Sequence, residues 1–168
     1  MTGSPEFFIL TRKECGEILA RNHVGRLAFR EGKQLNIQPL GYVASDTVLF
    51  LRSAPGSKMD ALARDPFVAF EVDEIEGPFD WRSVVVQGTI YAVERDGSAA
   101  EQRAVEAIKS VMPQAFTERD PAPDRQNIYG LHVHDVAGRM AQGNAAPSGR
   151  ERVTPRSGRT VRKPPDHF

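Results

Sequence analysis

The sequence has 168 residues and only one cysteine, Cys15. A single cysteine excludes a disulfide within the chain and a cysteine-built metal cluster, and it fits a reducing compartment, so we expect a cytoplasmic protein. No apolar run approaches the roughly 20 residues that a transmembrane helix needs. The N-terminus lacks the basic and apolar regions of a signal peptide. The formal net charge is +0, which argues against nucleic acid as the main partner.

The charge is nevertheless unevenly distributed along the chain. Residues 139–168 contain seven Lys or Arg and two Asp or Glu, so this segment carries +5 and the remainder −5. From about Gly143 the chain is rich in Gly, Pro, Ser and Arg and has few large apolar groups that could offset its ordering entropy. We therefore expect one domain over residues 8–140 and a basic, flexible tail over residues 143–168.

Three segments carry helix signals. Thr11–Glu14 and Ser98–Glu101 each have the capping-box pattern, in which the first and last residues satisfy each other's backbone donors. A third helix is expected to begin at Ser57. Cys15 falls on the apolar stripe of the first helix, so we expect it to be a small core residue and not a nucleophile.

Six apolar or alternating runs predict strands that are joined mostly by short turns. Glu31-Gly32-Lys33 is such a turn and indicates a hairpin. Short connections favour an antiparallel sheet or barrel over βαβ units. The expected strands are residues 24–29, 35–42, 48–51, 67–73, 82–94 and 128–134.

One strand-to-helix turn carries the clearest chemical signal. An apolar strand ends at Arg52 and Ser53, and a helix then starts at Ser57 with Lys58 in its first turn. Because a helix start offers unpaired N–H groups and a partial positive charge, these residues together can bind a phosphate. The segment lacks the Walker spacing of an NTP site. An ordinary turn with exposed cations is the alternative interpretation.

Six motifs follow one another at characteristic spacing. They are G-R-L-A from residue 25, P-x-x-Y from 39, G-S-K from 56, D-P-x-V-A-F-E-V-D from 65, W-x-S-V-V-V-x-G from 81 and D-V-A-G-R from 135. In this order they resemble the pyridoxamine 5'-phosphate oxidase-like superfamily of FMN-binding split barrels, and most of all its nitroimidazole-resistance-protein branch. The resemblance covers roughly residues 8–140. It implies a mainly β fold, a six-stranded antiparallel split β-barrel with about three flanking helices.

The resemblance also implies a function. Members of this superfamily bind FMN and are homodimers with the flavin at the subunit interface. We therefore expect an FMN-dependent oxidoreductase that passes electrons from reduced flavin to a small acceptor, with nitroaromatic compounds as candidates. The alternatives are a non-catalytic flavin-binding or sensor protein, or a relative that uses deazaflavin or haem.

The resemblance assigns the phosphate end of the cofactor to the strand-to-helix turn. A lysine occupies the position of Lys58 in the family, so Lys58 is the expected phosphate ligand. Related oxidases carry Arg-Lys where this chain has Ser57 followed by Lys58. This departure removes one cation and leaves Arg52, with the hydroxyl of Ser53, to compensate.

Two further strands match the family's ring-binding elements. The first contains Asn36, Gln38, Pro39 and Tyr42, and its backbone is expected to run along the flavin ring. A half-buried hairpin strand without a cofactor role is the alternative for these residues. Asn36 and Gln38 share one face of that strand, and Pro39, which has no N–H, suits an edge position.

The second such strand begins with Trp81 and Ser83. Trp81 either flanks the cofactor or closes the barrel end. Ser83 stands where the oxidases use a glutamine to touch the ring. His132 and His134 share a strand face, but without a third ligand pattern we expect a surface or interface role and no metal site.

Overall fold

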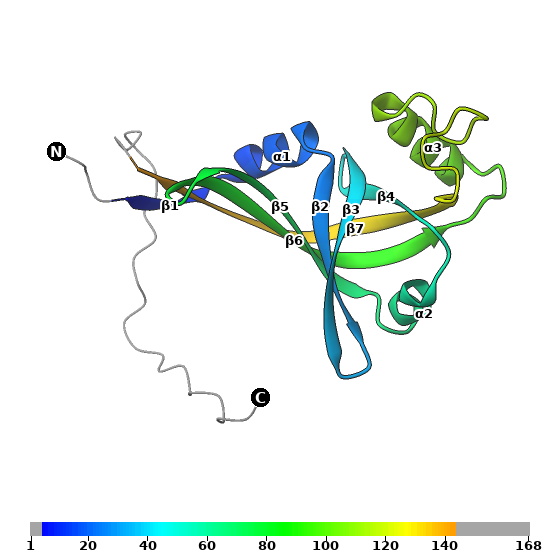
Figure 1. The fold of residues 1–168 in the computed structure, drawn as a ribbon, viewed down its shortest axis with the longest axis horizontal. Coiled ribbons are helices and arrows are strands. Elements are labelled where there is room, and N and C mark those ends of the chain that lie inside the picture. Colours follow the sequence, from blue (N-terminus) through cyan, green and yellow to red (C-terminus); the bar gives the residue numbers. More distant parts are fainter. Residues whose placement is uncertain (1–4, 144–168) are drawn as a thin grey trace.

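The computed structural model describes residues 5–143, which form one antiparallel sheet and three helices (Figure 1). The predicted tail from residue 144 onward lies outside the described residues. The helices are α1 (Arg12–Arg21), α2 (Ser57–Arg64) and α3 (Ala99–Val111). The strands are β1 (Glu6–Leu10), β2 (Val24–Glu31), β3 (Gln34–Ser45), β4 (Val48–Ser53), β5 (Phe67–Gly77), β6 (Asp80–Val93) and β7 (Asn127–Gln142).

The sheet closes on itself through its longest strand. The strand order is β1-β7-β4-β3-β2-β5-β6, and β6 also pairs with β7, so six strands form a ring. β7 has 16 residues, which allows β6 to pair along one edge while β4 and β1 share the other. This arrangement confirms the predicted mainly β split barrel. Strand β1, which the sequence patterns do not predict, extends the ring at β7.

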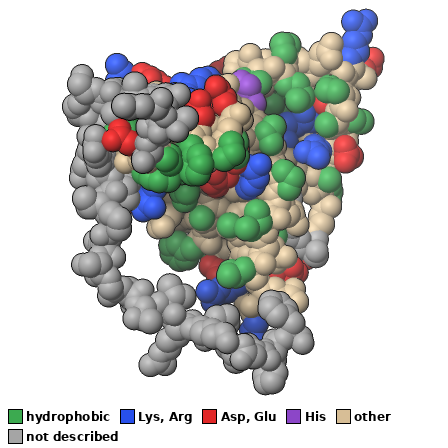
Figure 2. Space-filling model, turned by 60° about the vertical axis from the view of Figure 1, so that its left-hand side comes forward, with side chains coloured by type: hydrophobic (Ala, Val, Ile, Leu, Met, Phe, Trp, Pro, Cys, Tyr) green, Lys and Arg blue, Asp and Glu red, His purple; other side chains and the backbone are tan. Residues whose placement is uncertain are grey.

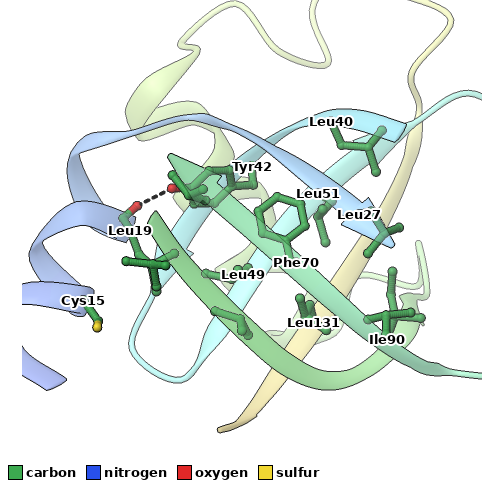
Figure 3. Close-up of a cluster of buried hydrophobic side chains, with 14 of the residues drawn as sticks. Cys15, Leu19, Leu27, Leu40, Tyr42, Leu49, Leu51, Phe70, Ile90 and Leu131 are labelled. Carbon is green, nitrogen blue, oxygen red and sulfur yellow. Dashed lines mark hydrogen bonds between the residues drawn. The ribbon is translucent and has the colours of Figure 1, made fainter. Parts of the chain in front are cut away.

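Apolar side chains from alternating strand positions fill the barrel (Figure 3). Leu27, Phe70 and Val86 lie opposite one another on β2, β5 and β6, and all three are fully buried. The ring of Tyr42 meets Phe70 edge-on, with 5.1 Å between the centroids. The Tyr42 hydroxyl donates a hydrogen bond of 2.8 Å to the Leu19 carbonyl oxygen, which ties the barrel to α1.

Each helix contributes apolar side chains to a core. α1 buries Cys15 and Ile18 in the main core, and this confirms Cys15 as a core residue. α2 adds Leu62 to the same core. α3 buries Ala104 and Ile108 in a second core over β4 and β7. None of the helices in the described range is both long and apolar enough to cross a membrane.

The two predicted helix caps differ in detail. At α1 the box is complete, because the Thr11 hydroxyl accepts from the Glu14 N–H and the Glu14 carboxylate accepts from the Thr11 N–H. At α3 the Ser98 hydroxyl accepts from the Glu101 N–H at 3.2 Å. The Glu101 carboxylate instead accepts from the Gly97 N–H at 2.7 Å, so the second box forms only in part.

The barrel is split where two pairs of strands separate. β3 pairs with β2 along their full hairpin, but with β4 only over Tyr42–Ser45. β2 in turn pairs with β5 only over Arg26–Ala28. The β2–β3 hairpin therefore projects beyond the barrel (Figure 1). This leaves β3 with an open edge near the end of β4, where α2 begins.

We predict that Gly25 is required for the packing of the G-R-L-A strand. A Cβ at this position would collide with the Phe70 ring and approach the Glu71 carbonyl oxygen to 2.8 Å. Gly25→Ala should therefore lower the free energy of unfolding by about 1–3 kcal/mol in urea titrations. Gly16→Ala is the control, because in α1 nothing lies within 4 Å of its Cβ, and it should raise stability by about 0.5–1 kcal/mol. A Gly25→Ala protein as stable as the native one would contradict this role.

Candidate functional site

Successive segments of β3 border three pockets. Residues 35–37 line the hairpin pocket, of about 520 Å³. Residues 38–40 line the split pocket, of about 400 Å³. Residues 41–43 line the α3 pocket, of about 130 Å³. All three pockets therefore lie along β3, and the open edge of this strand borders the split pocket.

The split pocket gathers several of the predicted cofactor residues. Gln38 and Pro39 come from β3, and Ser53 comes from the end of β4. The Pro55–Gly56 turn forms the floor toward α2, and Arg125 approaches from the loop between α3 and β7. The strand-to-helix turn and the ring-binding strand predicted from the sequence therefore meet at one place.

Helix α2 begins at the wall of the split pocket. Gly56 is its N-cap and makes no side-chain hydrogen bond to the first turn. The first N–H groups of α2 can therefore bind an anion. Ser57 and Lys58 occupy this first turn, but their side chains lie outside the described part of the structure, so their phosphate roles stay predictions.

Arg52 is not available as a phosphate ligand, in contrast to the prediction, because its guanidinium group is hydrogen-bonded within the protein. A guanidinium group has five N–H donors, and all five are used. Its Nε donates to the Arg125 carbonyl oxygen at 2.9 Å. The remaining donors bond both oxygens of the Asp120 carboxylate, the Met112 sulfur and the Ala122 carbonyl oxygen. The Arg52 side chain lies beneath the α3–β7 loop, so it has no donor left for a phosphate.

Asp120 is the ionic partner that holds Arg52. The shortest contact joins Arg52 Nη2 to Asp120 Oδ2 at 2.6 Å, and both side chains are buried. The Arg52 guanidinium lowers the pKa of Asp120 from 3.8 to about 2, helped by the N–H groups of Ala122 and Phe116. The guanidinium groups of Arg52 and Arg95 also lie over the Phe116 ring. Their Cζ atoms are 4.3 and 4.7 Å from the ring centroid.

Arg125 is the cation that sequence reasoning missed. Its side chain is exposed at the split pocket, and within residues 5–143 it forms no ion pair with a carboxylate. The bond from Arg52 to its carbonyl oxygen fixes its position. No motif surrounds Arg125 in the sequence, so its charge was the only signal that could have identified it.

The open edge of β3 presents backbone groups to the split pocket. The Tyr42 N–H donates to the His23 carbonyl oxygen on the β2 side. Because antiparallel strands alternate the direction of their backbone groups, those of Ile37 and Pro39 face the opposite, open edge. Pro39 thus loses no ladder bond, in agreement with the edge position expected from its missing N–H.

The hairpin pocket is bordered by apolar side chains that are exposed to solvent. Leu35 is 81% exposed, Ile37 70% and Phe67 69%. Figure 2 shows hydrophobic side chains standing among charged ones on one side of the molecule. Asn36 lines the same pocket, and its Nδ2 atom is buried without a hydrogen-bond partner in the described structure. A buried donor without an acceptor is costly, so this atom is a donor that a ligand in the pocket could use.

Three other predicted residues lie away from the split pocket. Tyr42 points into the core, where burial raises the pKa of its hydroxyl, so its side chain is structural. Trp81 and Ser83 border a separate pocket on β6 and β7. The Trp81 ring packs against the Phe7 ring, with 6.2 Å between the centroids. The Ser83 hydroxyl donates to Glu71 Oε1 at 2.8 Å. In the sheet, β2 and β5 separate these residues from β3.

The paired histidines also lie outside the split pocket. The rings of His132 and His134 meet edge-on at 5.5 Å. The His134 Nε2 atom lies 3.2 Å from the Thr89 hydroxyl. In residues 5–143, no group of three or more His, Cys, Asp or Glu is placed to hold a metal ion.

Comparison with known proteins supports the same assignment of the fold. The family model of pyridoxamine 5'-phosphate oxidase matches residues 11–140. The uncharacterized protein RA0666 of Rhizobium meliloti is 34% identical over 127 residues, which are 75% of this chain and 84% of that protein. The crystal structure of an FAD-binding protein from Mesorhizobium loti has 30% identity and a TM-score of 0.67, and covers 79% of this chain and 96% of its own.

A more distant structure shares the fold. It is a candidate 5-nitroimidazole antibiotic resistance protein from Bacteroides thetaiotaomicron, with 14% identity and a TM-score of 0.61. The match covers 84% of this chain and 90% of that one. At this identity the likeness concerns the fold alone.

We predict that the Arg52–Asp120 pair stabilises the loop above about pH 4. Asp120→Asn leaves a buried cation without its ionic partner and should lower the melting temperature at pH 7 by roughly 5–10 °C. Because the pKa of Asp120 is lowered from 3.8 to about 2 by folding, the contribution is complete above 3.8 and is lost as the pH falls toward 2. Thermal unfolding of both proteins should therefore show their difference shrinking over that interval.

Asp124→Asn is the matched control for this experiment, because Asp124 is an exposed aspartate in the same loop. Its melting temperature should stay close to that of the native protein at every pH. If Asp120→Asn and Asp124→Asn behaved alike at pH 7, the structural role of the pair would be wrong.

Proposed function

The chain belongs to the pyridoxamine 5'-phosphate oxidase family, and from this premise we propose that it binds FMN, alone or as the FMN part of FAD, and passes electrons from the reduced flavin to a small acceptor. One observation carries the proposal: the split pocket joins an uncapped helix start and the exposed residue Arg125. These are donors that a phosphate monoester requires. The Mesorhizobium relative is named for FAD, which supports a flavin.

The phosphate end of the cofactor fits the split pocket. We assign the phosphate to the first N–H groups of α2 and to the side chains of Ser57 and Lys58. The Ser53 hydroxyl donates to the Ala54 carbonyl oxygen at 3.1 Å, so it can reach a phosphate only by giving up that bond. Arg125 replaces Arg52 as the second cation in this assignment, since Arg52 has no free donor. Two cations then serve the phosphate, as in the Arg-Lys pair of related oxidases.

The ring end of the cofactor fits the edge of β3. The backbone groups of Ile37 and Pro39 face the open edge, where they can bond the polar rim of a flavin. The unpartnered Nδ2 of Asn36 is a further donor for a ring oxygen. Ile37 lies about 7 Å from Pro39 along an extended strand, a spacing over which one strand can follow a fused ring system.

A flavin supplies the redox chemistry of such a site when it is bound, and the chain binds and orients it. The lining of the split pocket includes one carboxylate, that of Asp124, on the exposed loop. We therefore propose that the residues of this pocket select and position the cofactor and do not act as acid or base. Nitroaromatic compounds are our candidate acceptors.

We propose further that the protein is a homodimer with the flavin at the interface. Leu35, Ile37 and Phe67 form an exposed apolar border beside the ring end. A second copy that covered this border would exclude water from the ring. It could also bring its own Trp81 and Ser83 to the cofactor, which one protomer does not do.

A non-catalytic flavin carrier is the second candidate function. The Ser83 hydroxyl is engaged by Glu71, where related oxidases turn a glutamine to the ring. A stable flavin complex that nicotinamide cofactors cannot reduce, and that reduces no nitroaromatic acceptor, would favour this alternative.

We predict that Lys58 and Arg125 both contribute to flavin affinity. Lys58→Ala and Arg125→Ala should each weaken FMN binding by about 1.5–3 kcal/mol, the value of a charged hydrogen bond, when FMN fluorescence quenching is titrated. Lys13→Ala and Arg119→Ala are the controls, because Lys13 is exposed on α1 and Arg119 is exposed in the same loop as Arg125. Unchanged affinity in Arg125→Ala would remove Arg125 from the site, and a native protein that binds no flavin would refute the proposal.

We predict that a charge on the apolar border disrupts the dimer. Ile37→Lys should raise the dimer dissociation constant by roughly a hundredfold, because the lysine would be buried without a partner. Size-exclusion chromatography with light scattering measures this change. Ala100→Lys is the control, since Ala100 is exposed on α3, which does not carry the apolar border. A native protein that is monomeric at high concentration would contradict the proposed interface.

A further inference from the structure

The α3 pocket lies between α3 and the outer side of the sheet. The Tyr42 side chain packs in the barrel core, so its neighbours Gly41 and Val43 face the other side of β3, because side chains alternate along a strand. Ile108 and Val111 of α3 line the pocket opposite them. The pocket therefore has one wall from the sheet and one from the helix.

The size and the walls of this pocket suit a single aromatic ring. Its volume is about 130 Å³, which is close to the roughly 150 Å³ of an apolar cavity that holds benzene. A site for a whole drug-sized ligand needs about 300 Å³ or more. Phe50 and Met112 both line the pocket, and aromatic and thioether groups make favourable contacts with a ring. We therefore expect a ligand with one ring.

The rim of the α3 pocket carries an excess of positive charge. His23 and Arg125 line the pocket, and both residues are exposed. Arg52 also lines it, but Asp120 compensates its charge and its five donors are used. Among the described residues no Asp or Glu lines this pocket, and Asp124 lines the split pocket instead. An anionic group on the ring would therefore meet two basic residues and no opposing carboxylate.

We infer that the α3 pocket is a binding site for a small aromatic carboxylate, a ligand of the benzoate class. The ring fills the space between Phe50 and α3, and the carboxylate faces His23 and Arg125 at the rim. A carboxylate suits this place because its two oxygens can accept parallel N–H bonds from a guanidinium group, and an imidazole adds a further N–H donor.

This site is distinct from the proposed flavin site. Ser53 lines the split pocket and its neighbour Arg52 lines the α3 pocket, so the two pockets lie on opposite faces of β4. Arg125 is the residue that lines both. The inference does not depend on a bound flavin, and it can be tested in the absence of one.

The first test compares three ligands on the full-length protein by isothermal titration calorimetry. Benzamide keeps the ring of benzoate without its charge, and acetate keeps the charge without the ring. Benzoate should bind roughly tenfold or more tightly than either of them, since the pocket offers both an apolar enclosure and a cation. Equal affinity for benzoate and one of these controls would overturn the inference. Absence of saturable benzoate binding up to about 10 mM would also overturn it.

Two variants block the pocket from opposite walls. A Cβ at Gly41 meets only the His23 carbonyl oxygen, at 3.7 Å, so Gly41→Leu places a side chain in the pocket without distorting β3. Val111→Trp fills the pocket from α3, where Val111 is 40% exposed at the rim. Both variants should lose most of the benzoate affinity. Ala100→Trp is the control, because Ala100 is exposed on α3 away from the pocket.

The blocking variants also locate the ligand. If Gly41→Leu and Val111→Trp both kept the native affinity for benzoate, the ligand would bind elsewhere and the inference would be wrong. Circular dichroism checks that each variant is folded. Because the two substitutions lie on different elements, a folding defect in one leaves the other decisive.

A charge variant tests the role of Arg125. Arg125→Gln should weaken benzoate binding by roughly tenfold and leave benzamide binding unchanged, because benzamide has no charge to lose. Arg119→Gln is the control, since Arg119 is exposed in the same loop and does not line the pocket. Unchanged benzoate affinity in Arg125→Gln, or an equal loss for benzoate and benzamide, would contradict charge recognition at this rim.

Discussion

The site depends on the buried pair of Arg52 and Asp120. It joins the end of β4 to the loop between α3 and β7, two segments that are 68 residues apart. Burial of an ion pair is costly unless the remaining donors are satisfied, and here every donor of Arg52 has an acceptor. The carbonyl groups of Ala122 and Arg125 complete the set. The same bonds that stabilise the pair therefore fix the loop, and with it the only cation that the described structure brings to the split pocket.

The second constraint is the incomplete pairing of β3. A closed barrel with continuous ladders would leave no backbone groups for a ligand, since each edge would be used by a neighbouring strand. Here β3 leaves β4 at Tyr42, after four paired positions. Its edge then becomes a surface that can recognise a flat polar molecule without a special side chain. Core packing tolerates the open edge of β3, because Leu27, Phe70 and Val86 hold β2, β5 and β6 together on the other side of β3.

Much of the fold could be predicted from local patterns, and the failures have physical reasons. The alternating strands, the cap at Thr11 and the turn before α2 depend on neighbours in sequence, so they were visible. β1 is short, and its role depends on pairing with β7 far along the chain. Arg52 and Ser53 are adjacent in sequence, but alternation along a strand points their side chains in opposite directions. Sequence order alone could not show that one side chain faces the loop.

Arg125 is a second residue whose position could not be predicted from the sequence. A loop arginine has no periodicity and no motif, and its place at the split pocket results from a hydrogen bond to its backbone carbonyl. This makes the loop between α3 and β7 the source of the cation that the described structure brings to the split pocket. With Arg52 as that cation, the charge would belong to the end of β4 and would not depend on the loop. Because the cation instead comes from the loop, it also faces the apolar pocket under α3. The exchange of Arg52 for Arg125 therefore makes the charge at the split pocket depend on the Arg52–Asp120 pair, because that pair holds the loop.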